Sequence, residues 1–258
     1  MVLQSNSKLI FEDNFDGPAL DINKWLPNYL PHWSSLELSA ASYEIKDKML
    51  RLFISENQQC WSPEFDGENK VSGIQTGHFA GPLNSPHGQH RFRDGLSVKS
   101  EVPEMQLFLP QYCRLDIRVR AKLKPWNLAA LWLIGFEDQP DHSGEITVFE
   151  IFGRSATANE AQVGRGIKRI NDPLLKDEFD DSILPLDVTD WHVYSKDWSP
   201  SQIDFFADGE LVTTTSQSPN YPMQLMLNFY EFPHRAPKTP EQDAWMEVDF
   251  IRCFAQSE

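Results

Sequence analysis

The sequence predicts an all-β protein built as a sandwich of two antiparallel sheets. Residues 113–121 alternate between apolar side chains at odd positions and polar side chains at even positions, which is typical of a strand with one buried face. Asp208-Gly209 stands between the strand-like runs 203–207 and 211–215 and is a strong hairpin signal. The 18 prolines are spread through the chain, so they favour short strands joined by turns over long helices. Many short alternating strands of this kind indicate a two-sheet sandwich.

A single domain spanning residues 1–258 is the organisation that we expect. A chain of 258 residues can bury a substantial core as one large all-β domain or as two smaller ones. No linker, low-complexity tract or internal repeat divides the sequence, which favours one domain. We assign Trp25, Trp191 and Trp198 to its core.

The charge balance of the chain is strongly acidic. It has 38 acidic and 23 basic residues, which gives a formal net charge of −15. Such a surface repels nucleic acid and anionic membranes, suits a neutral or weakly charged partner, and makes sulfated polysaccharides poor candidates. An alternative is that the acidic excess only keeps the protein in solution. We expect a monomer with neither a nucleic-acid nor a membrane partner.

Targeting and membrane signals are missing from the sequence as written. Residues 1–9 lack an apolar core long enough for a signal peptide, and the apolar run 128–136 is far too short to span a bilayer. We therefore expect a cytoplasmic protein, or an extracellular one if a leader has been removed. The three cysteines show no metal-binding spacing, and Cys113 and Cys253 are expected to be small buried apolar residues.

The segment 144–153 places Glu145 and Glu150 in a run otherwise made of β-branched and aromatic residues, with a glycine at each end. Side chains alternate between the two faces of a regular strand, so residues five apart point in opposite directions. A β-bulge that absorbs one residue, either Val148 or Phe149, would bring both glutamates onto one face and leave the apolar side chains on the other. We expect this bulge because it separates polar from apolar side chains.

A glycosidase needs at least two carboxyl groups on one concave surface. Retaining glycosidases hold these groups roughly 5–5.5 Å apart, so that one attacks the sugar and the other protonates the leaving oxygen. A straight strand would leave the Cα atoms of Glu145 and Glu150 about 13 Å apart, so the strand must be strongly curved. The alternative is that both glutamates are simply solvated residues of an ordinary strand.

The segment from Glu145 to Glu150 resembles the active-site signature of glycoside hydrolase family 16, in its bulged form of Glu, a hydrophobic residue, Asp, two further residues and Glu. Other stretches resemble the same family in the expected order, and the match runs from about residue 10 to residue 254. These stretches are 11–25, 72–76, 130–135, 190–209 and 246–252.

This resemblance implies a curved jelly roll with a substrate groove along its concave face. It also implies a double-displacement mechanism, with Glu145 as the nucleophile and Glu150 as the acid and then the base. Thr147 stands where the family has an Asp. A hydroxyl can donate a hydrogen bond to Glu145, but it carries no charge and cannot share a proton with a carboxylate.

Aromatic and amide side chains are the candidates for sugar binding. Trp132 is expected as a stacking platform, since strand spacing and the resemblance agree on it. Trp33 and Trp61 lie in loop-like segments, where they would either line one end of the groove or anchor loops against the core. Gln224 and Asn228 share a strand face and would either bind sugar hydroxyls or meet bulk solvent.

Three further features bear on the site. Residues 79–96 look like an insertion that would cap and shorten the groove. The resemblance implies a structural calcium in many family members, with Asp249 at the position of one ligand, but Asn14 stands where an acidic ligand is common. No cofactor is expected to be required, and the histidines fit no usual metal-ligand set.

Three functions remain open on this basis. The first is a retaining endo-acting β-glycosidase on a polysaccharide or oligosaccharide, and a β-1,3-glucan of the laminarin kind is the favoured substrate. The second is a catalytically weak module that binds carbohydrate as a lectin does, an alternative that rests on Thr147. The third is a transglycosylase on the same scaffold.

Overall fold

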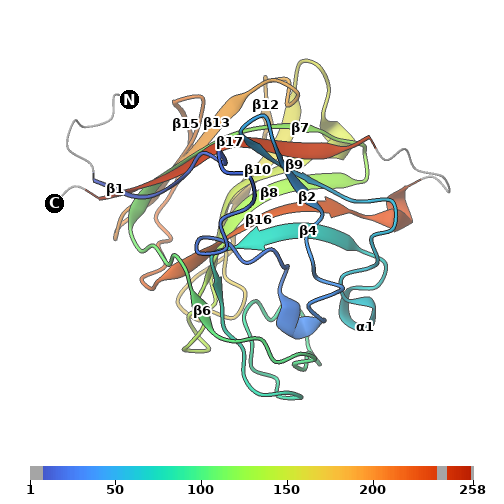
Figure 1. The fold of residues 1–258 in the computed structure, drawn as a ribbon. Helices are drawn as coiled ribbons and strands as arrows, with labels where there is room; N and C mark the ends of the chain where they lie inside the picture. Colours follow the sequence, from blue (N-terminus) through green and yellow to red (C-terminus); the bar gives the residue numbers. More distant parts are fainter. Residues whose placement is uncertain (1–7, 237–242, 257–258) are drawn as a thin grey trace.

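Two large antiparallel sheets make up the protein (Figure 1), and the computed structural model describes residues 8–236 and 243–256. The eight-stranded sheet has the order β15-β14-β13-β7-β17-β3-β2, with β1 beside β17. The seven-stranded sheet has the order β11-β10-β9-β8-β16-β4, with β12 beside β10. The predicted all-β sandwich is therefore confirmed, as a curved jelly roll.

The strands of the eight-stranded sheet are β1 (Leu9–Asp13), β2 (Tyr43–Lys46), β3 (Met49–Phe53), β7 (Cys113–Lys122), β13 (His192–Trp198), β14 (Ile203–Ala207), β15 (Glu210–Thr215) and β17 (Trp245–Ala255). Those of the seven-stranded sheet are β4 (Lys70–Gln75), β8 (Asn127–Gly135), β9 (Glu145–Phe152), β10 (Ala161–Lys168), β11 (Glu178–Asp180), β12 (Ile183–Leu184) and β16 (Met223–Glu231). A small separate pair is formed by β5 (Gly77–His78) and β6 (Met105–Gln106).

Helical structure among the described residues is confined to short turns. These are α1 (Pro63–Asp66) and the 3-10 turns η1 (Pro31–Trp33), η2 (Gly153–Ser155) and η3 (Pro233–Arg235). None of these helices is long and apolar enough to cross a membrane.

Two sequence-level predictions about strands are confirmed in the eight-stranded sheet. Along β7, odd-numbered residues are buried and even-numbered residues are half-buried, as the alternation predicted. Asp208 and Gly209 join β14 to β15, with φ of 50° and 83°. Positive φ at both central residues is what a type I′ hairpin turn requires.

The main hydrophobic core lies between the two sheets. Ile117 and Val119 of β7 face Leu131, Ile146 and Phe149 of the seven-stranded sheet within one continuous cluster. Trp25, Trp198, Cys113 and Cys253 are also fully buried in the protein, as expected. Trp191 was wrongly assigned to the core: it is half-buried and lies between the guanidinium groups of Arg118 and Arg120, 4.9 and 4.6 Å from their Cζ atoms.

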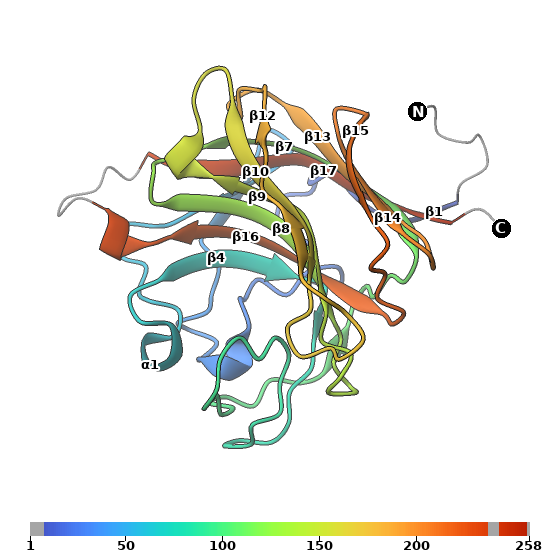
Figure 2. The same cartoon turned by 180° about the vertical axis from the view of Figure 1, so that it is seen from behind.

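The opposite face of the seven-stranded sheet is covered as well. A second cluster joins Trp132 and Met226 of the sheet to Tyr29, Trp61 and Val98. Seen from either side, the connections that carry α1 and β6 lie beyond the seven-stranded sheet, on the side away from β7 and β17 (Figures 1 and 2). Burial on both faces explains why all nine residues of β8 are buried.

Candidate active site

The strand β9 contains a bulge at the predicted place. Across from it on β8, Leu131 pairs with Phe149 while the next residue, Trp132, pairs with Thr147. Val148 is therefore the extra residue of β9. Without the bulge, the alternation of faces along β9 would place the apolar side chains beyond Val148 on the polar face. The extra residue keeps them on the apolar face.

This register places Glu145, Thr147 and Glu150 on the face of β9 that points away from the main core. Ile146 and Phe149 point instead into that core, where both are fully buried. On the neighbouring strand β8, Ile134 pairs with Glu145. The predicted separation of polar and apolar side chains on this strand is confirmed.

Lys168, at the end of β10, brings the two carboxyl groups together. Its Nζ lies 3.0 Å from Glu145 Oε1 and 2.7 Å from Glu150 Oε1. Those two oxygens can therefore be no further apart than the sum of these distances, which is close to the roughly 5–5.5 Å typical of retaining glycosidases. Thr147 Oγ1 donates a hydrogen bond of 2.7 Å to Glu145 Oε1, the same oxygen that Lys168 contacts.

Burial and neighbouring charges act on the pKa values of Glu150 and Lys168. Burial raises the pKa of Glu150 above its ordinary value, the attraction of Lys168 opposes this rise, and the charge of Glu145 adds to it. For Lys168, burial acts to lower the pKa, but the two carboxylates outweigh it and the pKa is raised. Glu150 thus has the tendency to hold a proton that a general acid needs, while Lys168 stays charged.

Solvent reaches the carboxyl pair from the Glu150 side. The side chain of Glu145 is 4% exposed, that of Glu150 13% and that of Lys168 32%. Opposite Thr147 and Glu150 on β10 stand Gly166 and Gly164, which carry no side chain over the cluster. Gly166 has a φ of +131°, and a Cβ there would lie 2.2 Å from the carbonyl oxygen of Glu178, so only glycine fits this position.

Trp132 lies beside the carboxyl pair, in the middle of an aromatic group. It is 4% exposed, and its ring centroid lies 4.9 Å from that of His90 and 6.3 Å from that of Tyr29. His90 belongs to the segment 79–96 that the sequence suggested as a cap, and it covers Trp132 from above the sheet. Burial lowers the pKa of His90, although the nearby charge of Glu145 acts to raise it.

The other sugar-binding candidates are more deeply enclosed. Trp33 and Trp61 are 0% and 1% exposed, and their indole N–H groups are bound by Gln89 O and Asp66 Oδ2, so both anchor loops. Gln224 is fully buried, and its Oε1 accepts a 2.6 Å hydrogen bond from Gln89 Nε2.

Asn228 is as buried as these residues but, in the part of the chain that the structure describes, lacks hydrogen-bond partners for its side chain. It is fully buried, yet neither its Oδ1 nor its Nδ2 has a hydrogen-bond partner among the described residues. It lies beside Ala130, the residue that pairs with Glu150, and opposite Gly73, whose missing side chain leaves room for the amide. An unpaired amide of this kind is suited to bind a sugar hydroxyl.

Asp249 and Asn14, the two residues considered for a calcium site, both contact arginines. Asp249 Oδ2 accepts a 2.6 Å hydrogen bond from Arg118, and Asn14 Oδ1 accepts one of 3.1 Å from Arg252. Within residues 8–236 and 243–256, no group of three or more His, Cys, Asp or Glu side chains is arranged to hold a metal ion.

Comparison with known proteins agrees with this geometry. Residues 105–250 match the family described as glycosyl hydrolases family 16. The chain belongs to this family. The matched region runs from β6 to β17 and contains the bulged strand with both carboxyl groups.

Individual relatives within the family differ in substrate. A glucan endo-1,3-beta-glucosidase A1 from Niallia circulans is 24% identical over 272 residues, which cover 96% of this chain and 38% of that protein. A solved structure of a GlcNAcα1-4Gal-releasing endo-β-galactosidase from Clostridium perfringens matches 97% of this chain and 63% of its own, with 26% identity and a TM-score of 0.83. The laminarinase catalytic domain of Thermotoga petrophila, 17% identical with a TM-score of 0.65 over 98% of this chain and 99% of its own, shares the fold.

Two residues of this family 16 site escaped the sequence analysis, Lys168 and His90. Lys168 reaches the glutamates only through the pairing of β10 with β9, in which it stands opposite Glu145. The local signal was the run Gly164, Gly166 and Lys168, which places two small residues and one charge on a single strand face. His90 gave no comparable signal, because it lies in an irregular loop.

Proposed function

We propose that this protein is a retaining endo-β-glycosidase. The observation that carries the proposal is the convergence of Glu145 and Glu150 on a single lysine amine, at a separation suited to double displacement. Family membership supports glycoside hydrolysis in general, and the exposed side of Glu150 supports entry of a sugar from that direction.

In the first step, a carboxylate oxygen of Glu145 attacks the anomeric carbon while Glu150 donates its proton to the glycosidic oxygen. The bond between these two substrate atoms breaks, and a covalent glycosyl–Glu145 ester forms. In the second step, Glu150 removes a proton from water, the water oxygen attacks the anomeric carbon, and Glu145 leaves. Two inversions give net retention of configuration.

Thr147 and Lys168 take over two tasks in this mechanism. The Thr147 hydroxyl fixes the orientation of Glu145 through its hydrogen bond. Lys168 offsets part of the negative charge of the pair, and Thr147 adds no charge between the two glutamates. Burial acts to keep the proton on Glu150.

A β-galactosidic linkage is the first substrate class to test. The similarity to the Clostridium perfringens endo-β-galactosidase, with a TM-score of 0.83, exceeds the 0.65 found for the Thermotoga petrophila laminarinase. The cap formed by residues 79–96 also favours a short or branched glycan over a long unbranched polymer. A β-1,3-glucan, which the sequence favoured, is the second candidate and is supported by the Niallia circulans relative.

The test is release of reducing ends from a panel of β-galactans, galactose-containing oligosaccharides and β-glucans. We expect activity that disappears in both Glu145→Gln and Glu150→Gln. A matched control is Glu231→Gln, because Glu231 is a buried glutamate of the same seven-stranded sheet that pairs with Lys70 at 3.3 Å, outside the carboxyl cluster. The anomeric configuration of the first product, followed by NMR, should match that of the substrate.

Two outcomes would favour the other functions. Saturable sugar binding without turnover, unchanged in Glu145→Gln, would identify a lectin-like module and end the hydrolase proposal. Turnover that requires an added sugar acceptor would identify a transglycosylase, which uses the same first step and replaces water in the second.

A further inference from the structure

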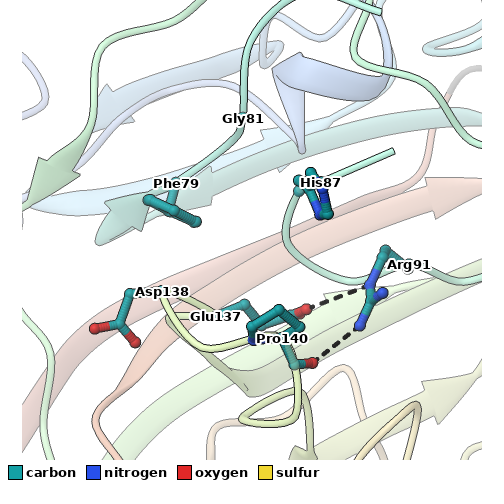
Figure 3. A pocket seen from close by; sticks show the side chains of 8 residues that line it. Phe79, Gly81, His87, Arg91, Glu137, Asp138 and Pro140 are labelled. Carbon is teal, nitrogen blue, oxygen red and sulfur yellow. Dashed lines mark hydrogen bonds and ion pairs between the residues drawn. The ribbon is translucent and has the colours of Figure 1, made fainter. Parts of the chain in front are cut away.

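A separate hollow of about 300 Å³ lies beyond the loop that carries His90. It is bounded by the segment after β5 and by the segment that follows β8 (Figure 3). Phe79 and His87 stand on one side of it, and Glu137 and Asp138 face them from the other. None of these residues belongs to the catalytic cluster.

Glu137 is the chemically unusual member of this pocket. It is 5% exposed, and its Oε1 accepts a 2.5 Å hydrogen bond from the backbone N–H of His90. Its Oε2 is buried without a hydrogen-bond partner among the described residues, and the closest cation, Arg91 Nε, is 4.0 Å away. Burial raises the pKa of Glu137 to about 8. A buried oxygen left unpaired destabilises the fold, and a ligand hydroxyl would supply the missing hydrogen bond.

Glu137 and His90 also share an uncommon backbone conformation. Glu137 has a φ of 58° and His90 a φ of 53°, and these two residues are joined by the hydrogen bond just described. A residue other than glycine held in the left-handed region is strained, and such residues cluster at functional sites. The fold therefore holds both residues in place at a cost to its stability.

The walls of the pocket have the chemistry of a sugar site. The ring of Phe79 and the ring of Pro140 offer apolar faces to the C–H groups of a pyranose. The Glu137 carboxyl group accepts or donates a hydrogen bond, and the Arg91 guanidinium donates. The net charge of −15 on the whole chain opposes an anionic sugar and favours a neutral one.

His90 connects this pocket to the catalytic cluster. Its backbone holds Glu137, while its ring packs against Trp132 and lies close enough to Glu145 and Lys168 to feel their charges. A single residue therefore separates the pocket from the stacking platform of the active site.

We propose that the pocket between residues 79–91 and 136–140 is a subsite for one neutral sugar unit of the glycan, with Phe79 as its stacking surface and Glu137 as its hydroxyl ligand. The proposal rests on the proposed glycosidase function and adds a determinant of substrate length or branching. The Glu137–His90 hydrogen bond joins the subsite to the residue that packs on Trp132.

The experiment compares galacto- and gluco-oligosaccharides that grow by one unit at a time. With the unaltered chain, kcat/KM should rise sharply at the length that first fills the pocket. In Glu137→Gln, which keeps an oxygen for the His90 N–H, and in Phe79→Ala, this rise should shrink by roughly tenfold while the shorter substrates are cleaved as before. Asp94→Asn, an exposed carboxyl change in the same loop, is the matched control.

Direct binding separates a failure of this subsite from a failure of the glycosidase function. The same oligosaccharides are titrated by calorimetry into Glu145→Gln alone and into Glu145→Gln combined with Glu137→Gln or Phe79→Ala. Weaker binding of only the longer sugars in the double variants supports the subsite even where no turnover is found. Equal affinities for all lengths overturn the subsite, and they leave hydrolysis by Glu145 and Glu150 unaffected.

Discussion

Glu145 and Glu247 are both buried glutamates paired with cations, but they lie on opposite sides of the molecule. On the seven-stranded sheet, Glu145 and Glu150 share a single Lys168. On the outer face of the eight-stranded sheet, the single carboxylate of Glu247 binds two arginines, Arg51 at 2.5 Å and Arg120 at 2.7 Å.

The balance of positive and negative charges within each cluster decides what that cluster can do. Glu247 shares Arg51 with Glu44, whose Oε1 lies 2.9 Å from Arg51 Nη1, so two carboxylates are paired with two arginines. The Arg120 guanidinium also lies over the rings of Trp191 and Trp245, with its Cζ atom 4.6 and 5.6 Å from their centroids. Such a balanced cluster stabilises the sheet. Two carboxyl groups against one lysine leave an unbalanced acid, and that imbalance allows Glu150 to gain and lose a proton. A surplus of negative charge in a buried group therefore indicates catalysis more clearly than burial alone.

The largest expected effect is the loss of activity in Glu145→Gln. The amide is a poor nucleophile, so kcat should fall by at least about 10³-fold. The temperature of unfolding should change little, because removing one charge relieves the crowding of the carboxyl pair. Activity on the best substrate of the panel and thermal unfolding of the same preparation check this prediction, and retained turnover would exclude Glu145 as the nucleophile.

Glu247→Gln should show the reverse pattern. Activity should be kept, since Glu247 lies on the outer face of the other sheet. The free energy of unfolding should drop by about 2 kcal/mol, less than the ~3–5 kcal/mol of a fully buried pair because both arginines are about one-third exposed. Urea unfolding measures the change, and an activity loss as large as that of Glu145→Gln would break the distinction between the two clusters.

Lys168→Met removes the one cation among the described residues that contacts both Glu145 and Glu150. Because Lys168 acts to lower the pKa of Glu150, its loss should raise that pKa further. The alkaline limb of the pH–activity profile, where Glu150 loses its proton, should therefore move to higher pH, and kcat should fall roughly tenfold or more. Lys168→Arg should restore the position of the limb. An unmoved limb in Lys168→Met would contradict the assigned role.

Glu150→Gln tests the same imbalance through stability. The pKa of Glu150 is raised in the folded protein, so the favourable contribution of its proton is complete below the unfolded-state pKa and is lost as the pH rises through the folded-state pKa. Glutamine does not ionise, so the variant does not lose stability at this position as the pH rises. The variant should therefore unfold at a higher temperature than the unaltered chain at neutral and alkaline pH, and the difference should disappear in acid. Thermal unfolding across the pH range checks the sign.

Thr147→Val should have the smallest effect. It removes one neutral hydrogen bond to Glu145, which contributes about 1 kcal/mol, so kcat should fall roughly fivefold. Thr147→Ser, which keeps the hydroxyl, serves as the control. A loss equal to that of Glu145→Gln would mean that the hydroxyl does more than orient the carboxylate.

The sequence allowed the bulged strand β9 to be predicted because its information is local. A one-residue bulge is the only way to sort the polar and apolar side chains of residues 145–152, and the register confirms it at Val148. Lys168 and Gln224 depend instead on pairing and loop contacts between residues far apart in the chain. Gln89 closes over Gln224 from a loop whose path follows no periodic pattern. Trp191 was misplaced because an aromatic residue beside a strand can be covered by arginines as well as by the core.

The burial of β8 on both faces has a consequence for the order in which the molecule opens. Its backbone is paired on one side with β9 and on the other with β16, and all nine of its residues are buried. Amide hydrogens of β8 should therefore be among the last to exchange with deuterium, and local openings should start at the sheet edges and loops. Since β9 pairs with this strand, the backbone of Glu145 and Glu150 lies beside one of the most protected parts of the sheet.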